Sequence, residues 1–195
     1  MLKAREKILD AIKLTESDGW DSVKEKDGNS LWKMKAADSS INIMKRFMTV
    51  NVPISKAVDF YRDPEGIKSV NKKIIVNSIV LDVTDNVKLI RREIKGNMLV
   101  SNRDMSIFWN LIELTDGSIA ICMFSTEHEK IPKTKAVRAE LDIGFLLFKP
   151  VSESSTSILS IIRLDPKGSI PATFVNKMSK KQHEEFENIK KKLES

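Results

Sequence analysis

Cysteine is nearly absent from this chain of 195 residues, in which Cys122 is the only one. A lone cysteine excludes an internal disulfide and a cysteine-based zinc cluster, and it is typical of proteins in a reducing compartment. Histidine is also scarce, because only His128 and His183 are present and they lie far apart in the sequence. Two separated histidines are a poor basis for a metal site. We therefore expect a cytoplasmic protein that holds no metal and no cofactor.

Long hydrophobic runs are missing as well. The longest, Ile143–Phe148, is far shorter than the roughly 18 residues of a membrane-spanning helix. Residues 1–7 are rich in charge and lack the apolar segment of a signal peptide. The chain has 33 Lys and Arg against 27 Asp and Glu, a net charge of +6, and only 6% aromatic residues. This mild basic excess favours transient contact with an anionic membrane surface and gives no reason to expect a nucleic-acid partner.

Hydrophobic residues make up 41% of the chain, enough for the core of a single domain over residues 1–195. Apolar periodicity predicts helices at Leu2–Leu14, Pro53–Asp63, a short segment after Pro64, and Pro171–Leu193. The predicted strands are Leu31–Ala36, Ile41–Val52, Ile74–Val83, Val87–Ile94, Arg103–Leu114, Ile119–His128, Val137–Phe148 and Ile158–Leu164. This order predicts an α+β fold in which a curved antiparallel sheet wraps the long C-terminal helix, with an internal hydrophobic cavity between them.

Alternation along the strands separates an apolar face from a more polar one. The expected cavity face comprises Met105, Ile107, Trp109, Leu111, Ile119, Ile121, Met123, Ala139, Leu141, Ile143, Ile162 and Leu164 from the strands, with Phe174, Val175 and Met178 from the last helix. On the opposite face, Asp104, Ser106, Phe108 and Asn110 suit solvent, while Cys122 suits a packed thiol. The apolar set would hold a lipid tail, since each methylene removed from water contributes about 0.8 kcal/mol. An ordinary closed core has the same composition, so the residues alone leave both interpretations open.

A lipid headgroup needs a polar partner, and Arg92 is the candidate. It lies on the predicted strand Val87–Ile94, in which Ile90 and Ile94 mark the buried side. An inward guanidinium offers several fixed donors to a phosphate or a carboxylate. Alternatively, Arg92 pairs with a neighbouring glutamate in solvent near the strand end.

Five short strings, in order along the chain, resemble the START domain family, the steroidogenic-acute-regulatory-related lipid transfer proteins. They are Trp32-Lys33, Ser101-Asn102-Arg103-Asp104, Ser125-Thr126-Glu127-His128 before Ile131-Pro132, Val137-Arg138-Ala139-Glu140, and Asp165-Pro166-Lys167-Gly168-Ser169-Ile170-Pro171. The resemblance implies the helix-grip fold with an internal tunnel for one lipid. It also implies that Arg103 and Asp104 form a structural ion pair or a loop anchor.

The chain departs from the family pattern at three positions. Asn102 stands where the family usually has proline. Trp109 and Leu141 stand where sterol-binding members carry a cavity arginine and histidine. Because both polar partners are lost, a sterol bound through those contacts is not expected.

The segment Gly96–Asn102 has the glycine and asparagine of a loop but carries three successive apolar residues. Exposed apolar residues in a loop usually mark an interaction site. By resemblance this loop forms a membrane gate with Met98 and Leu99 at its tip, and Ile170 and Pro171 lie across from it. The alternative is that Met98 and Leu99 cap the core under the last helix.

No catalytic motif accompanies these features, since neither histidine lies beside a candidate nucleophile. The sequence and its resemblance therefore predict a monomeric, non-catalytic protein that binds one lipid, a phospholipid, a sterol or a related molecule, in an internal tunnel and transfers it between membranes. Two alternatives remain: a lipid sensor without transfer activity, and a small-molecule enzyme of the wider START-like superfamily.

Overall fold

The computed structural model describes residues 2–26, 28–98 and 100–195, with the side chains of residues 2–5 and 178–183 left undescribed. Its helices are α1 (Leu2–Glu16), α2 (Ile54–Arg62), α3 (Pro64–Val70) and α4 (Ala172–Glu194). Its strands are β1 (Asp21–Lys26), β2 (Asn29–Met34), β3 (Ile43–Val50), β4 (Ile74–Thr84), β5 (Val87–Ile94), β6 (Arg103–Glu113), β7 (Ile119–Ser125), β8 (Val137–Arg138), β9 (Glu140–Ser152) and β10 (Ser155–Asp165). The predicted α+β class is therefore confirmed.

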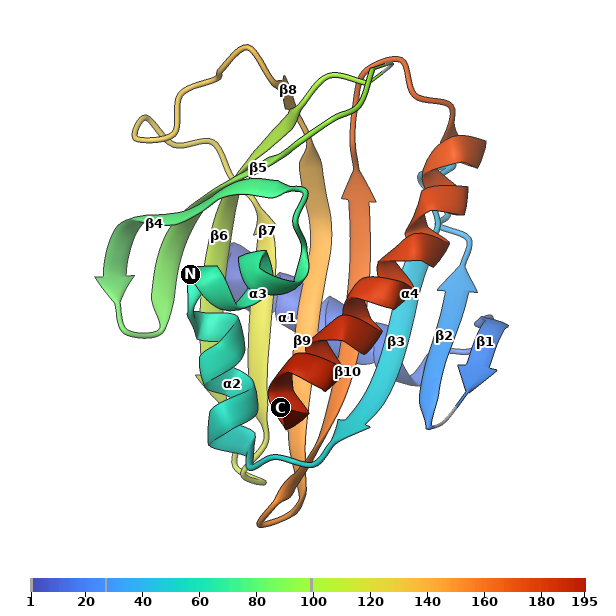
Figure 1. The fold of residues 1–195 in the computed structure, drawn as a ribbon, viewed down its shortest axis with the longest axis vertical. Helices are drawn as coiled ribbons and strands as arrows, with labels where there is room; N and C mark the ends of the chain where they lie inside the picture. Colours follow the sequence, from blue (N-terminus) through green and yellow to red (C-terminus); the bar gives the residue numbers. More distant parts are fainter. Residues whose placement is uncertain (1, 27, 99) are drawn as a thin grey trace.

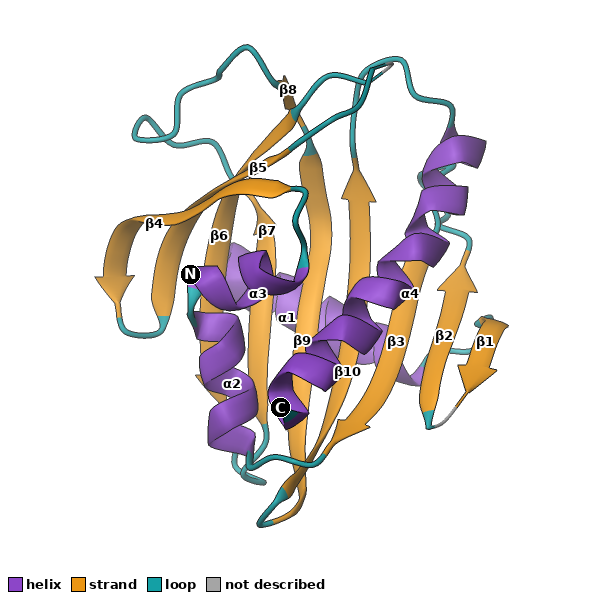
Figure 2. Cartoon of the chain, in the orientation of Figure 1, coloured by secondary structure: helices purple, strands orange, loops and turns teal. Residues whose placement is uncertain are grey.

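The strands form one sheet in the order β1-β2-β3-β10-β9-β7-β6-β5-β4, with β8 beside β6. Neighbouring strands along this order are antiparallel, whereas the short β8 runs parallel to β6. The sheet curves, and α4 runs obliquely across its hollow side (Figure 1). Helices α2 and α3 lie on the same side, while α1 lies behind the sheet (Figure 2).

Each face of the sheet has its own hydrophobic cluster. We call the face under α2, α3 and α4 the inner face, where Phe186 and Ile189 of α4 pack with Ile121 and Ile158 of the sheet. We call the face under α1 the outer face; there the helix contributes Ile8 and Ala11 to the second cluster. The sheet is thus the middle layer of three, which explains why many of its strands are buried on both sides.

Local signals place the two short helices. Pro53 immediately precedes α2, and Pro64 occupies the first turn of α3, where its missing N–H costs no hydrogen bond. The Asp63 side chain accepts a hydrogen bond from the backbone N–H of Glu65 at 2.9 Å and so caps α3.

Several predictions about the strands were wrong. Strand β1 was not predicted, because Asp21–Lys26 is polar on both faces and is exposed except at Val23. The last strand was predicted to begin at Ile158, which is three residues too late, because β10 already begins at Ser155. The segment Val137–Phe148 is two strands, since β8 ends at Arg138 and β9 begins at Glu140.

The prediction that Ile143 faces inward was also wrong. Leu164 pairs with Leu141, whereas Arg163 pairs with Ile143, so Asp142 is an extra residue in β9. A bulge of this kind reverses the alternation beyond it. Leu141 therefore packs in the inner cluster, while Ile143 packs against the outer one.

The polar set of β6 was expected in solvent, and this was wrong too. Asp104, Ser106 and Asn110 are each less than 9% exposed, and Phe108 packs against the outer cluster. Periodicity did not reveal that a second layer covers the outer face. The prediction for Cys122 is confirmed: it is buried in the outer cluster, and desolvation raises the pKa of its thiol to about 11.

Candidate functional site

The inner face carries most of the side chains predicted to line a cavity. Six of them are buried in the inner cluster: Met105, Ile107, Trp109, Ile121, Ala139 and Leu141. Met123, Ile162 and Leu164 pack against that cluster, and Val175 is buried elsewhere in the core. Phe174, in contrast, is 44% exposed, so in this conformation it does not belong to the enclosed surface. The side chain of Met178 lies outside the described residues.

These lining residues differ in how completely they are covered. Ile107 and Ile121 have no exposed surface and Trp109 has 2%, as expected of solid packing. Met123, Ile162 and Leu164 are only half-buried, although they lie on the inner face of central strands. Partial exposure in the middle of a covered sheet is unusual, because the layer above should exclude water.

The half-buried residues occupy neighbouring positions on the sheet. Met123 pairs with Gly144, and Gly144 pairs with Ile162. A Cβ atom at Gly144 would lie 3.0 Å from Leu141 Cδ2 and 3.1 Å from Met123 Cβ. Because Gly144 has no side chain, no atoms project from the sheet at this position. Accessible apolar surface is therefore present along this row of β7, β9 and β10.

Arg92 points to the inner face, in register with Met105. Its Nε donates a hydrogen bond to Asn77 Oδ1 at 3.0 Å, and desolvation lowers the pKa of its guanidinium. Arg92 is nonetheless half-buried rather than buried. The sequence also allowed Arg92 to pair with a neighbouring glutamate. That ion pair is instead formed by Arg91, which contacts Glu93 at 2.9 Å.

Three further ionisable side chains on the inner side were not predicted. Arg46 of β3 is 6% exposed, and desolvation lowers the pKa of its guanidinium to about 10. Glu185 of α4 accepts a hydrogen bond from Asn71 Nδ2 at 2.9 Å. Tyr61 of α2 stacks edge-on against Phe148, and its hydroxyl is buried with no hydrogen-bond partner among the described residues.

Glu185 links these groups electrostatically. Desolvation raises the pKa of its carboxyl group, against the opposing influence of Arg46 and Arg92. Desolvation likewise raises the pKa of Tyr61, and the nearby Glu185 adds to that rise. We call Arg46, Tyr61, Arg92 and Glu185 the buried polar cluster.

Alternation could have revealed one member of this cluster, because Arg46 lies two residues from Met44 and from Met48 on the same face of β3. Glu185 shares a helical face with Ile189, four residues on, but it was overlooked because charged residues are expected in solvent.

The two loops predicted to form the gate lie at one end of the sheet (Figure 1). Met98 is fully exposed, with a relative accessibility of 102%, while Ile170 is half-buried and Pro171 is exposed. Leu99 lies outside the described residues. The exposure of Met98 excludes the alternative in which this residue caps the core.

Arg103 holds the two loops together. Its Nη1 donates to the carbonyl of Ser101 at 2.6 Å, its Nε to that of Pro166 at 2.9 Å, and its Nη2 to that of Lys167 at 3.0 Å. Gly168 follows with a φ of +73°, which favours glycine, and a Cβ atom there would lie 3.2 Å from Arg103 Nη2. The expectation that Arg103 is a loop anchor is therefore confirmed.

Asp104 does not pair with Arg103. Its two carboxylate oxygens accept hydrogen bonds from Nε and Nη2 of Arg138, each at 3.0 Å. Because the side chain of Asp104 is 0% exposed, this is a buried, bidentate ion pair between β6 and β8.

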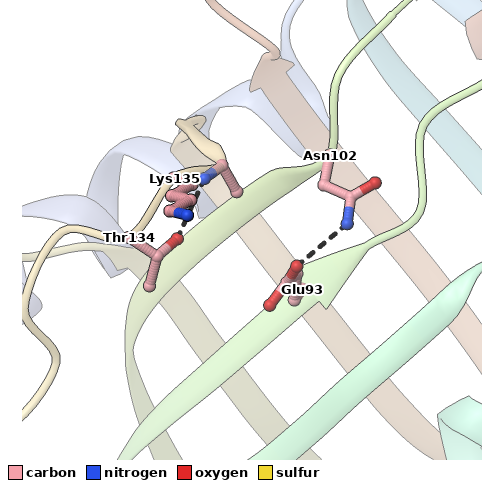
Figure 3. Close-up of a pocket in the computed structure, with 5 residues that line it drawn as sticks. Glu93, Asn102, Thr134 and Lys135 are labelled. Carbon is pink, nitrogen blue, oxygen red and sulfur yellow. Dashed lines mark hydrogen bonds between the residues drawn. The ribbon is translucent and has the colours of Figure 1, made fainter.

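A surface pocket of about 280 Å³ lies beside these loops, lined by Glu93, Asn102, Thr134, Lys135 and Ala136. Figure 3 shows Asn102 hydrogen-bonded to Glu93, with Thr134 and Lys135 on the other side. Asn102 also accepts a hydrogen bond from the backbone N–H of Gly96 at 3.0 Å. Asn102, which stands where proline was expected, thus closes the base of the loop.

Comparison with known proteins identifies this arrangement. The family model of the START domain matches residues 6–193. The chain belongs to the START domain family. It is 27% identical over 165 residues to START domain-containing protein 10 of Mus musculus, an alignment that covers 83% of this chain and 56% of that protein. The chain thus spans little more than half the length of that relative.

Solved structures of START proteins share the fold. The chain matches human STARD10 with a TM-score of 0.86 at 22% identity, over 95% of this chain and 77% of that one. It matches human StAR-related lipid transfer protein 5 with a TM-score of 0.85 at 18% identity, over 97% and 95% of the two chains. The predicted helix-grip fold is confirmed. START domains are a family of lipid-transfer proteins, and no helix among the described residues is long and apolar enough to cross a membrane.

Proposed function

We propose that this START domain binds one lipid between the inner face and α4 and carries it between membranes, as a monomer in the cytoplasm and without catalysis. The supporting observation is the row formed by Met123, Gly144 and Ile162, where apolar side chains keep accessible surface beneath the covering layer. A lipid tail would complete the burial of that surface, which would stabilise the complex in proportion to the area covered.

Arg92 gives this proposal a second support. Its Nε donates to Asn77, which is 7% exposed, yet Arg92 itself is only half-buried. Accessible surface on an enclosed side chain is expected where it borders an internal space rather than bulk water. The same space would be lined by Met105, Leu141 and Leu164 from the sheet, and by Val175 from α4.

Exchange would take place at the gate. The loop that carries Met98 and the segment Ile170–Pro171 would enter the interface of an anionic bilayer, and α4 would move away from the sheet there. In water the closed gate would keep the tail enclosed, so release would be slow without a membrane.

Native mass spectrometry of the purified protein, followed by lipid extraction, tests binding. We expect one lipid per chain, and we expect Ile162→Trp, which fills the proposed space, to lose it. Leu159→Trp serves as the matched control, because Leu159 lies on the same strand and packs on the outer face. Retention of the lipid by Ile162→Trp, or a protein that never carries one, would refute the proposal.

A transfer assay separates a carrier from a sensor. We expect the protein to move a fluorescent lipid from donor to acceptor vesicles faster than spontaneous exchange does. If lipid is bound but not moved, the chain is a sensor, and the transfer part of the proposal is wrong.

A further inference from the structure

Lys167 has a backbone conformation that is unusual for its residue type. Its φ is +52°, and among the described residues it is the one non-glycine residue with a positive φ. The left-handed conformation costs an L residue free energy, and a residue stays in it only where its surroundings hold it there. Lys167 lies in residues 166–171, which join β10 to α4 and which we call the entry segment (Figure 1). The contacts of Lys167 therefore store strain beside the proposed gate.

Backbone and side-chain contacts hold Lys167 in this conformation. Its N–H donates to Asp165 Oδ1 at 2.8 Å, and its carbonyl accepts from Arg103 Nη2 at 3.0 Å. Its ammonium Nζ lies 2.7 Å from Glu140 Oε2 and 2.8 Å from Asp165 Oδ2. The hydrogen bonds to Asp165 and Glu140 raise the pKa of the ammonium, so it keeps its charge at neutral pH.

The two carboxylates that bind this ammonium face each other. Glu140 and Asp165 are paired residues of β9 and β10, and Asp165 ends β10 directly before the entry segment. Like charges directly opposite each other destabilise a pair of strands. The Lys167 ammonium contacts both carboxylates and offsets their repulsion. Without it, the repulsion would act on the strand ends that carry the entry segment.

These ion pairs are open to competing anions. The side chains of Lys167, Glu140 and Asp165 are 45%, 53% and 33% exposed. Exposed ion pairs contribute little to stability and are weakened by salt, so an anion from outside can take the place of a carboxylate. The phosphate groups of an anionic bilayer supply such anions where the gate is proposed to dock, and a lysine ammonium binds phosphate well.

We propose that Lys167 is a strained latch: on an anionic bilayer its ammonium exchanges Glu140 and Asp165 for lipid phosphates, and the entry segment then moves away from Arg103. The Lys167 backbone leaves the left-handed region in this step, so the stored strain favours opening. This inference rests on the proposed transfer function and adds a positioning residue that couples membrane contact to release of the lipid.

Spin labels on the two loops of the proposed gate measure opening without any bound lipid. Lys95→Cys and Ser169→Cys place exposed thiols on the two loops, and Cys122 is buried, so labelling is selective. We expect pulsed electron paramagnetic resonance to show a longer distance between the labels on vesicles containing phosphatidylserine than in solution. Vesicles of phosphatidylcholine alone should leave the distance unchanged, because their surface has no net negative charge to attract the ammonium.

Variants of the latch assign this response. Asparagine tolerates the left-handed conformation but has no charge, so Lys167→Asn should show the longer distance already in solution and no further change on vesicles. Glu140→Gln added to Lys167→Asn removes the repulsion, so the double variant should have the short distance in solution and on both kinds of vesicle. Lys133→Asn is the matched control: Lys133 is an exposed lysine at the same end without an ion pair among the described residues, and the response should persist.

Release of lipid should follow the same order. Without vesicles, Lys167→Asn should lose a bound fluorescent lipid severalfold faster than the natural protein, since two exposed ion pairs are lost and two carboxylates repel each other. The double variant and Lys133→Asn should release it at nearly the natural rate.

The outcomes separate the latch from the function on which it rests. The latch is refuted by an equal distance in Lys167→Asn and the natural sequence under every condition, or by a lengthening on phosphatidylcholine as large as on phosphatidylserine. If the distances change as expected but no variant binds or releases a lipid, the transfer function is wrong and the latch stands. Should Lys167→Asn fail to fold, as judged by its melting curve, Lys167→Gly replaces it, because glycine adopts a positive φ without strain.

Discussion

Arg103 joins the two loops of the proposed gate. Its guanidinium donates to carbonyl groups of both loops, at Ser101 and at Pro166 and Lys167. Arginine is needed because its donors form a fixed fork, whereas a lysine ammonium reaches fewer of these oxygens.

Arg103→Lys should therefore loosen both loops. We expect unfolding free energy to fall by about 1.5–3 kcal/mol, since buried carbonyls lose a charged donor, and bound lipid to leave several times faster. Urea denaturation and dilution-driven release measure the two effects. Arg91→Lys, which alters a partly exposed ion pair to Glu93, should change stability by less than about 1 kcal/mol. Equal losses of stability in the two variants would show that Arg103 does not anchor the loops.

Asp142 is a second residue with a measurable role, because it ties α1 to the sheet. Desolvation acts to raise the pKa of its carboxyl group, but hydrogen bonds from Lys7, at 2.8 Å, and from Arg163 hold that pKa below its usual 3.8. A lowered pKa in the folded state means that folding favours the ionised form.

The stability contributed by Asp142 should thus be complete at pH values above its ordinary pKa and should disappear as the pH falls through the lower, folded pKa. Asp142→Asn should be less stable than the natural protein at neutral pH, and the difference should shrink as the solution is acidified towards pH 3. Thermal melting between pH 3 and pH 7 tests this. A constant difference over that range would show that the charge of Asp142 does not matter.

At the scale of elements, the sequence predicted most helices and strands, because their apolar periodicity is strong and their boundaries carry proline or glycine. The bulge at Asp142 was beyond reach, since nothing in Leu141-Asp142-Ile143 signals an extra residue. Strand β1 was missed for the opposite reason: it is an exposed edge strand, held mainly by its pairing with β2. In the site, alternation predicted the apolar lining and could also have revealed Arg46, whereas Glu185 was missed because charged residues are expected in solvent.

The first turns of α4 are attached to the rest of the protein by one side chain, and this attachment bears on lipid exchange. Asn176 joins them to the turn before β3: its Oδ1 accepts from the N–H of Asn42 at 2.9 Å, and its Nδ2 donates to the carbonyl of Ser40 at 3.0 Å. Beside this contact lies a pocket of about 320 Å³ that reaches Met44, and Met44 pairs with Ile162 in the sheet. The Asn176 contact therefore fastens the first turns of α4 beside a surface pocket whose lining reaches the strand next to Ile162.

Asn176→Ala should loosen the attachment of the first turns of α4 to the segment before β3. We expect a loss of about 1–2 kcal/mol in unfolding free energy for two neutral hydrogen bonds, and a severalfold faster lipid exchange in a vesicle transfer assay. Lys24→Ala is the control, because Lys24 contacts Glu187 at 3.0 Å and joins α4 to the sheet farther along the helix, at the surface. If both variants exchange lipid at the same rate, opening does not start at the beginning of α4.

At the scale of the whole molecule, the two ends differ: the loops of the proposed gate lie at one end and the β9–β10 hairpin lies at the other (Figure 1). The end with the proposed gate carries the fully exposed Met98 and exposed lysines that include Lys95, Lys130, Lys133 and Lys135, against the exposed Glu127 and Glu129 of the neighbouring loop. Lysines near an anionic bilayer contribute about 1 kcal/mol each, and an exposed apolar side chain adds its burial in the interface. This end is therefore expected to dock on membranes.

Met98→Asp tests the docking without disturbing the fold, since Met98 makes no buried contact. We expect co-sedimentation with vesicles containing phosphatidylserine to fall severalfold, because the substitution removes an apolar contact and adds a charge that the anionic surface repels. Raising the salt concentration should reduce binding of the natural protein as well, since screening acts on the lysines.

Val151→Asp is the matched control for Met98→Asp. Val151 is 62% exposed at the opposite end of the molecule, and its substitution should leave binding unchanged. Equal losses in the two variants would mean that net charge, and not the orientation of the gate, governs membrane contact; unchanged binding in both would place the docking surface elsewhere.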